Sequence, residues 1–175
     1  SLDYELAFNQ NKSSFISYFS YQNTKRTHYT GIMPDEDDAE AYANHFKQPP
    51  YGDTKNSTIQ VGAQINHKLD KFLSGTNQLT AGLEYQYDDI LDEILSYNYK
   101  IDQTTKNIGL FVQSDWEAFR GFNLLLGARA DKHNMVDKII INPRVSALYK
   151  IGKETQIRAS WASGFRAPQA FDTDM

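Results

Sequence analysis

Apolar and polar residues alternate along most of this chain. Between positions 79 and 87 every second residue is apolar or aromatic, and the residues between them are polar or glycine. Successive side chains of a β-strand point to opposite faces of a sheet, so the pattern predicts a strand with one apolar and one polar face. The apolar face of this strand consists of Leu79, Ala81, Leu83, Tyr85 and Tyr87.

The same alternation recurs in other segments, with Leu125 and Leu148 as exceptions. Each alternating run lasts about ten residues, which is the length of a tilted strand that crosses a bilayer. We predict eight strands, at residues 2–10, 14–24, 57–69, 78–90, 104–118, 121–133, 139–151 and 154–165.

The connections between these predicted strands alternate in length. Those after the second, fourth and sixth strands are long, and the others are short: Asn11-Lys12, Asp70 to Asn77, Arg120-Gly121 and Gly152-Lys153. Outer-membrane barrels have short periplasmic turns at one rim and longer extracellular loops at the other. The sequence therefore predicts an all-β fold, an antiparallel up-and-down meander of about eight strands that forms part of a transmembrane β-barrel.

The longest predicted connection is an extracellular-type loop over residues 31–53. Asp35 follows Pro34 and is expected to cap a short helix that ends before Pro49-Pro50. One face of this helix would carry Ala39, Tyr42, Ala43 and Phe46.

Aromatic residues are expected near the ends of the predicted strands, where a girdle at the membrane interface belongs. Aromatic residues are also common in any β-strand, which is the alternative explanation. The residues concerned are Tyr85, Tyr87, Trp116, Phe119, Phe122, Tyr149, Trp161 and Phe165.

Composition excludes several classes of protein. The 175 residues include 18 basic and 22 acidic side chains, a net charge of -4, so no basic surface for nucleic acid is expected. Without cysteine there are no disulfides and no thiolate metal sites. No apolar run is long enough for a transmembrane helix, and the mean hydropathy of -0.61 is compatible with a barrel whose inner face and loops are polar.

Residues for catalysis, for a cofactor or for a metal are not recognisable. There is no nucleophile elbow, no carboxylate pair of known spacing and no phosphate-binding glycine loop, so we expect no enzyme activity. Two acidic groups, 35–40 and 88–93, lack the spacing of a calcium site and are expected to be solvated loops.

Three of the four histidines, His28, His45 and His133, fall near the predicted extracellular rim, and His67 lies near a strand end. The three could contact an iron chelate or haem, or could be ordinary polar residues of loops.

A longer motif occupies residues 142–168, with the sequence NPRVSALYKIGKETQIRASWASGFRAP. It resembles TonB-dependent outer-membrane receptors, in which a strand from Pro-Arg to Tyr precedes a tight turn and a second strand running into Gly-Phe-Arg-Ala-Pro. Residues 109–115 and 127–131 also resemble barrel strands of that family. The matching residues of the motif are Pro143, Arg144, Tyr149, Arg158, Gly164, Phe165, Arg166, Ala167 and Pro168.

The resemblance implies a barrel of about 22 strands closed by a plug, located in the outer membrane of a Gram-negative bacterium. Such receptors import a siderophore-bound iron, haem, cobalamin or an oligosaccharide with energy passed through TonB. Arg144, Arg158 and Arg166 lie on polar faces and would point to the lumen, where they could pair with a plug or only be solvated. Phe165-Arg166-Ala167-Pro168 also resembles a motif of haem receptors, and occurs in receptors for other ligands.

This chain departs from the family pattern in length. No plug precedes the first predicted strand, the strands are too few, and Met175 replaces the terminal aromatic residue, so we expect a fragment of the barrel. In isolation, such a fragment would hide its apolar face by forming an oligomer or by curling on itself. Two alternatives remain: a complete small eight-stranded barrel with a structural or adhesive role, and a soluble β-sandwich binding module.

Overall fold

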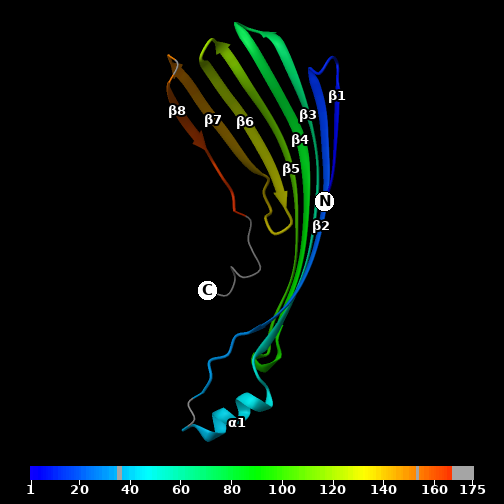
Figure 1. Ribbon diagram of the computed structural model, residues 1–175. Coiled ribbons are helices and arrows are strands. Elements are labelled where there is room, and N and C mark those ends of the chain that lie inside the picture. Colours follow the sequence, from blue (N-terminus) through cyan, green and yellow to red (C-terminus); the bar gives the residue numbers. More distant parts are fainter. Residues whose placement is uncertain (35–36, 153, 167–175) are drawn as a thin grey trace. The chain divides into compact units, whose positions relative to one another are not determined.

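The protein forms one antiparallel sheet in which each strand pairs with its neighbours in sequence (Figure 1). The computed structural model describes residues 1–34, 37–152 and 154–166. The predicted meander of eight strands is confirmed. The elements are β1 (Leu2–Phe8), β2 (Ser13–Tyr29), α1 (Ala39–Lys47), β3 (Tyr51–Phe72), β4 (Gly75–Ile94), the 3-10 turn η1 (Leu95–Tyr97), β5 (Tyr99–Phe119), β6 (Phe122–His133), β7 (Ile140–Ile151) and β8 (Thr155–Ala162).

The sheet is open within the described residues. Its strand order runs from β1 to β8, and β1 and β8 stand at its two edges without pairing with each other. A complete small barrel would pair its first strand with its last, and a sandwich would need a second sheet. The single open sheet argues against both alternatives.

Strands β2 to β5 are longer than the sequence pattern predicted. The connection between the fourth and fifth strands is shorter than expected, because β4 continues to Ile94 and β5 begins at Tyr99. Tyr85 and Tyr87 consequently lie inside β4 and not near its end. The turn after β3 is also tighter than expected, since only Leu73 and Ser74 separate β3 from β4.

Helix α1 confirms that the long connection contains a helix, but its cap differs from the prediction. The Asp38 carboxylate accepts a hydrogen bond from the amide nitrogen of Ala41 at 3.0 Å, which makes Asp38 the N-cap. Asp35, the predicted cap, lies outside the described residues. Neither α1 nor η1 has the length and apolar composition to cross a membrane, and the described residues contain no other helix.

The long strands contribute to two compact units. The short-turn unit contains residues 1–20, 60–86 and 106–166, and the loop unit contains residues 21–59 and 87–105. Four strands, β2 to β5, contribute residues to both units.

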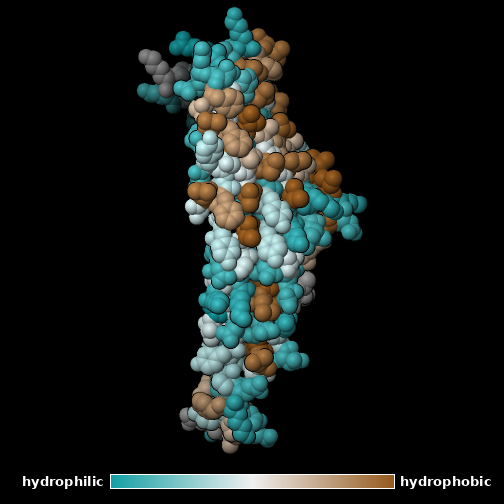
Figure 2. Space-filling view, turned by 90° about the vertical axis from the view of Figure 1, so that its right-hand side faces the viewer, coloured by the Kyte–Doolittle hydropathy of each residue, from teal (hydrophilic) through white to brown (hydrophobic). Residues whose placement is uncertain are grey.

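The short-turn unit has an inverted distribution of polarity. Val112 is 55% exposed and Trp161 is 61% exposed, whereas Asn77, Asp131 and the neighbouring His133 are buried. In the view of Figure 2, apolar side chains lie together over part of the face that is shown. We call the face that carries Val112 and Trp161 the outer face and the opposite face the inner face. A water-soluble protein places its apolar groups in the reverse way.

Aromatic rings cluster beside the short turn between β5 and β6. The rings of Phe119 and Phe122 stack with centroids 5.0 Å apart, and the ring of Tyr149 on β7 lies 6.5 Å from each. In addition, the Trp116 ring meets the Phe72 ring edge-on at 6.0 Å. Four of the aromatic residues that the sequence placed near strand ends are therefore grouped near one rim.

Neighbouring positions on β5 test the assignment of the two faces. We expect Val112→Arg to lower the free energy of unfolding in lipid bilayers by about 2–4 kcal/mol, because the charge would enter the apolar layer. Gln113→Arg, at the same depth on the inner face, should change it by less than about 1 kcal/mol. Denaturant titration of the complete protein in vesicles measures both, and equal losses would refute the assignment.

Candidate functional site

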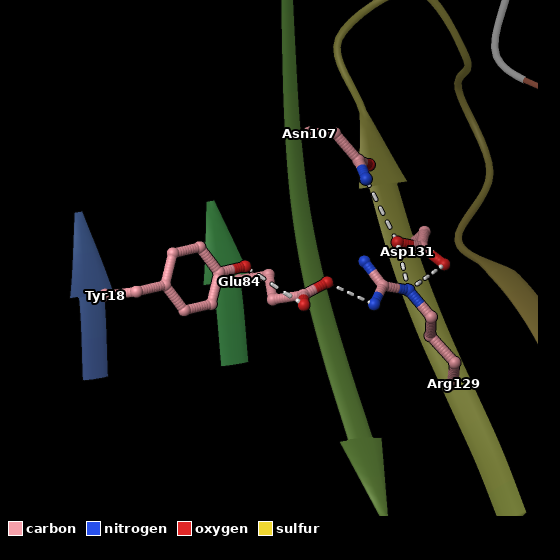
Figure 3. A network of polar contacts seen from close by, with 5 residues as sticks. All are labelled: Tyr18, Glu84, Asn107, Arg129 and Asp131. Carbon is pink, nitrogen blue, oxygen red and sulfur yellow. Dashed lines mark hydrogen bonds and ion pairs between the residues drawn. The ribbon is translucent and has the colours of Figure 1, made fainter. Parts of the chain in front are cut away.

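A polar network crosses the inner face of the short-turn unit (Figure 3). Its side chains come from strands that are not all neighbours, namely β2, β4, β5 and β6. The residues are Tyr18, Glu84, Asn107, Arg129 and Asp131.

Arg129 is the centre of this network. Its Nη1 donates to Glu84 Oε2, and its Nε donates to both carboxylate oxygens of Asp131 at 2.9 and 3.0 Å. Tyr18 donates its hydroxyl to Glu84 Oε1 over 3.1 Å, and Asn107 Nδ2 donates to Asp131 Oδ1 over 3.0 Å. Charged hydrogen bonds of this kind are stronger than neutral ones, so the network joins non-adjacent strands firmly.

Two glycines make these contacts possible. Adjacent strands are about 4.8 Å apart, so a side chain that reaches the second strand along must pass over the strand between. A Cβ atom on Gly62 of β3 would lie 2.2 Å from the Tyr18 ring, and one on Gly109 of β5 would lie 2.2 Å from Arg129 Nη2. The missing side chains let Tyr18 and Arg129 approach Glu84 from both sides.

The network leaves unused hydrogen-bonding capacity. Asp131 is only 5% exposed, and Asn107 Oδ1 is buried without a partner among the described residues. A cavity of about 370 Å³ lies beside them and is lined also by Asn142 and Phe165. Asn107 Oδ1 could accept a hydrogen bond from a ligand or from another segment of protein that enters this cavity. Such a bond would be favourable because an unpaired buried acceptor is costly.

Of the arginines that the sequence singled out, Arg144 and Arg158 lie on the same inner face. Arg144 borders a cavity of about 380 Å³ together with Glu84 and Arg129. Arg158 lies opposite Leu148 in the β7–β8 pair, and Arg166 follows the end of β8. Of the family-signature residues, Ala167 and Pro168 lie outside the described residues.

The sequence pattern did not identify the network itself. Glu84 and Arg129 are each a polar position of an alternating segment, but nothing in the sequence indicates that they meet. One pattern could have indicated the contact: a glycine on one strand with long polar side chains on the two strands that flank it. Strand register is needed to use that signal, and it cannot be obtained from alternation alone.

The three candidate histidines occupy separate environments. In the loop unit, the His28 ring covers Gly52, and His45 Nε2 lies 2.5 Å from the Tyr29 hydroxyl. In the short-turn unit, His133 is 3% exposed and its Nδ1 accepts from the Met135 amide at 3.2 Å. Their predicted contact with a ligand stays a prediction.

The acidic group of residues 88–93 lies within β4, so its prediction as a solvated loop is wrong. Threonine hydroxyls of neighbouring strands donate to its carboxylates: Thr58 to Asp88 at 2.5 Å, Thr104 to Asp89 at 2.7 Å and Thr54 to Asp92 at 2.6 Å. No cluster of three or more metal-ligating side chains is found in the described part of the chain.

Replacement of a crossing glycine should break the network. In Gly109→Ala the new Cβ would displace the Arg129 guanidinium from Glu84, and we expect a loss of about 1–3 kcal/mol in unfolding free energy. Gly127→Ala is the matched control, because a Cβ there would meet nothing closer than 3.5 Å. Equal unfolding free energies for the two variants would contradict this role of Gly109.

The comparisons with solved structures show the fold. One is a chain of the FpvAI–pyocin S2 complex, with a TM-score of 0.67 and 13% identity over 91% of this chain. Another is the siderophore receptor PirA from Pseudomonas aeruginosa, with a TM-score of 0.59 and 17% identity over 90% of this chain. This chain spans 25% and 30% of the length of those two chains, respectively. A comparison with curated proteins finds no match.

The family comparison agrees with the fold. The model of the TonB dependent receptor-like, beta-barrel family matches residues 1–175. The open antiparallel meander, with its apolar outer face and polar inner face, has the architecture expected of a segment of such a barrel. The chain belongs to the TonB-dependent receptor-like β-barrel family.

Proposed function

We propose that the chain is a wall segment of a TonB-dependent receptor that imports a scarce nutrient across the outer membrane of a Gram-negative bacterium. The observation that carries this proposal is the inverted polarity of the short-turn unit. Exposed Leu83, Leu110 and Val112 share the outer face, and the charged groups of the Arg129 network, with Asp131 buried, lie on the inner face. Lipid is the environment in which such a sheet is stable.

The aromatic cluster of Phe119, Phe122 and Tyr149 supports the same placement. Aromatic rings of barrel proteins gather at the level of the lipid headgroups. These three rings flank the β5–β6 turn, which places that turn near an interface. Because the turn is short, as periplasmic turns are, we assign it to the periplasmic rim.

The inner face is suited to contact a plug. The Arg129 network and Arg144 present charged groups to two neighbouring cavities, and Asn107 Oδ1 has no partner among the described residues. A plug domain that donates a hydrogen bond there would satisfy this acceptor. Transport would then depend on TonB acting on that plug in the complete receptor.

A ferric siderophore is the first candidate for the imported nutrient. The support is fold similarity to a protein described as a siderophore receptor. Haem is the second candidate, supported by Phe165-Arg166 and by the presence of His28 and His45 in the loop unit. Cobalamin and oligosaccharides are the remaining candidates among the scarce nutrients considered.

Location and uptake can be tested on the complete receptor that contains this chain. We expect it to fractionate with outer membranes and to migrate faster in gels before heating than after, because a folded barrel resists detergent. Deletion should abolish growth on one ferric siderophore as sole iron source. Parallel cultures should test growth that depends on haem, on cobalamin and on an oligosaccharide. Recovery in the soluble fraction would refute the proposed function.

The histidines of the loop unit allow a narrower test. We expect His28→Ala combined with His45→Ala to weaken binding of the imported ligand to the complete receptor by about tenfold, as for the loss of about 1.4 kcal/mol. His67→Ala serves as the control, because His67 contacts Ser13 beside the short β1–β2 turn. Unchanged affinity of the double variant, measured by fluorescence titration, would remove these residues from the ligand site.

A further inference from the structure

Strands β2 and β3 keep a constant antiparallel register through the loop unit. Asn23 Nδ2 donates to Ser57 Oγ at 2.7 Å, and Thr27 Oγ1 donates to Asp53 Oδ1 at 2.7 Å. In an antiparallel pair, a step of one residue forward along β2 faces a step of one residue backward along β3. The position midway between the two hydrogen-bonded pairs therefore places Lys25 directly opposite Lys55.

The two lysines are like charges without a counterion among the described residues. Side chains that face each other across a strand pair have Cβ atoms about 4.5–5.5 Å apart, and like charges there are destabilising. Ion pairs of basic side chains in the described part of the chain involve Lys12, Lys100 and Arg129, and neither Lys25 nor Lys55. Within the described ranges, no anionic side chain forms an ion pair with either lysine.

Nearby carboxylates are engaged elsewhere. Asp53 accepts from Thr27, and Glu93 pairs with Lys100 at 3.2 Å. Lys25 and Lys55 instead border a groove of about 330 Å³, and the Arg26, Asp53 and Glu93 residues complete its charged lining. The groove has space for a group as large as a phosphate.

Lys25 and Lys55 lie a few residues along their strands from side chains suited to a membrane interface. Lys25 and Tyr21 are four residues apart on β2 and share a face, as do Lys55 and Ile59 on β3. Tyr21 and Ile59 have the amphipathic and apolar character expected at the edge of the hydrocarbon. Four residues span about 13 Å along a strand, and a lysine side chain can bend back over part of that distance.

We propose that Lys25 and Lys55 bind the phosphate groups of an outer-leaflet lipid. The positive pair is complementary in charge to a phosphorylated glycolipid, and it lies four residues along β2 and β3 from Tyr21 and Ile59, within reach of lipid phosphates above the hydrocarbon. The lipid anion removes the repulsion between the two ammonium groups. This inference rests on the proposed outer-membrane location and adds a lipid site that does not depend on the imported nutrient.

The test uses the complete receptor in phosphatidylcholine nanodiscs, with lipid A added as the probe. We expect Lys25→Gln combined with Lys55→Gln to weaken lipid A binding about 30-fold, since each basic residue near an anionic surface contributes to affinity. The double variant of Lys68→Gln and Lys150→Gln, two exposed lysines of the short-turn unit, is the control and should bind as the wild type does.

A second measurement separates lipid binding from a general effect on folding. Without lipid A, the Lys25→Gln and Lys55→Gln variant should unfold at a temperature equal to or above that of the wild type, because the repulsion is gone. With lipid A, only the wild type and the control should gain thermal stability. Inorganic phosphate at the same concentration should produce no such gain.

Three results would overturn the lysine site. They are equal lipid A affinity in the wild type and the double variant, an equal loss in the control, and full stabilisation of the wild type by inorganic phosphate. Each can occur in a receptor that fractionates with the outer membrane, so the proposed function would survive. Absence from the outer membrane would instead refute the proposed function.

Discussion

Backbone hydrogen bonding between neighbouring strands is the constraint on which the rest of this structure depends. A strand with one face in lipid cannot satisfy its amide groups with water, so each must pair along the sheet. The uninterrupted ladders, such as that from Phe122–Tyr149 to Asp131–Ile140 between β6 and β7, meet this requirement. With the backbone satisfied, the side chains are free to separate, apolar groups to the outer face and charged groups to the inner face.

A strand could be predicted from the sequence wherever its apolar and polar side chains are separated onto opposite faces. Where one face is apolar, as from Leu79 to Tyr87, alternation predicted the strand correctly. From Asp88 to Glu93 the signal disappears, because charged residues occupy both faces, yet β4 continues to Ile94. Hydrogen bonds from Thr54, Thr58 and Thr104 hold that segment, and such pairs depend on contacts that are distant in sequence.

The inner-face network illustrates a different limit of prediction. Each of Tyr18, Glu84 and Arg129 is an unremarkable polar position within its own strand. Their meeting depends on the register of β2 through β6 and on glycine at positions 62 and 109. The arginines of the family motif, Arg144 and Arg158, could be placed on the polar face because alternation alone decides that. Their partners could not, because alternation contains no information on which strands lie two apart.

The two crossing glycines also restrict the order in which this wall can change during evolution. Gly62 can acquire a side chain without a clash only after Tyr18 has been replaced by a smaller residue, and Gly109 only after Arg129 has been shortened. The reverse order passes through an intermediate in which two side chains compete for one space. Substitutions at each pair of positions are therefore coupled and directional, so drift in the lumen surface of this barrel would begin at Tyr18 or Arg129 and reach the glycines second.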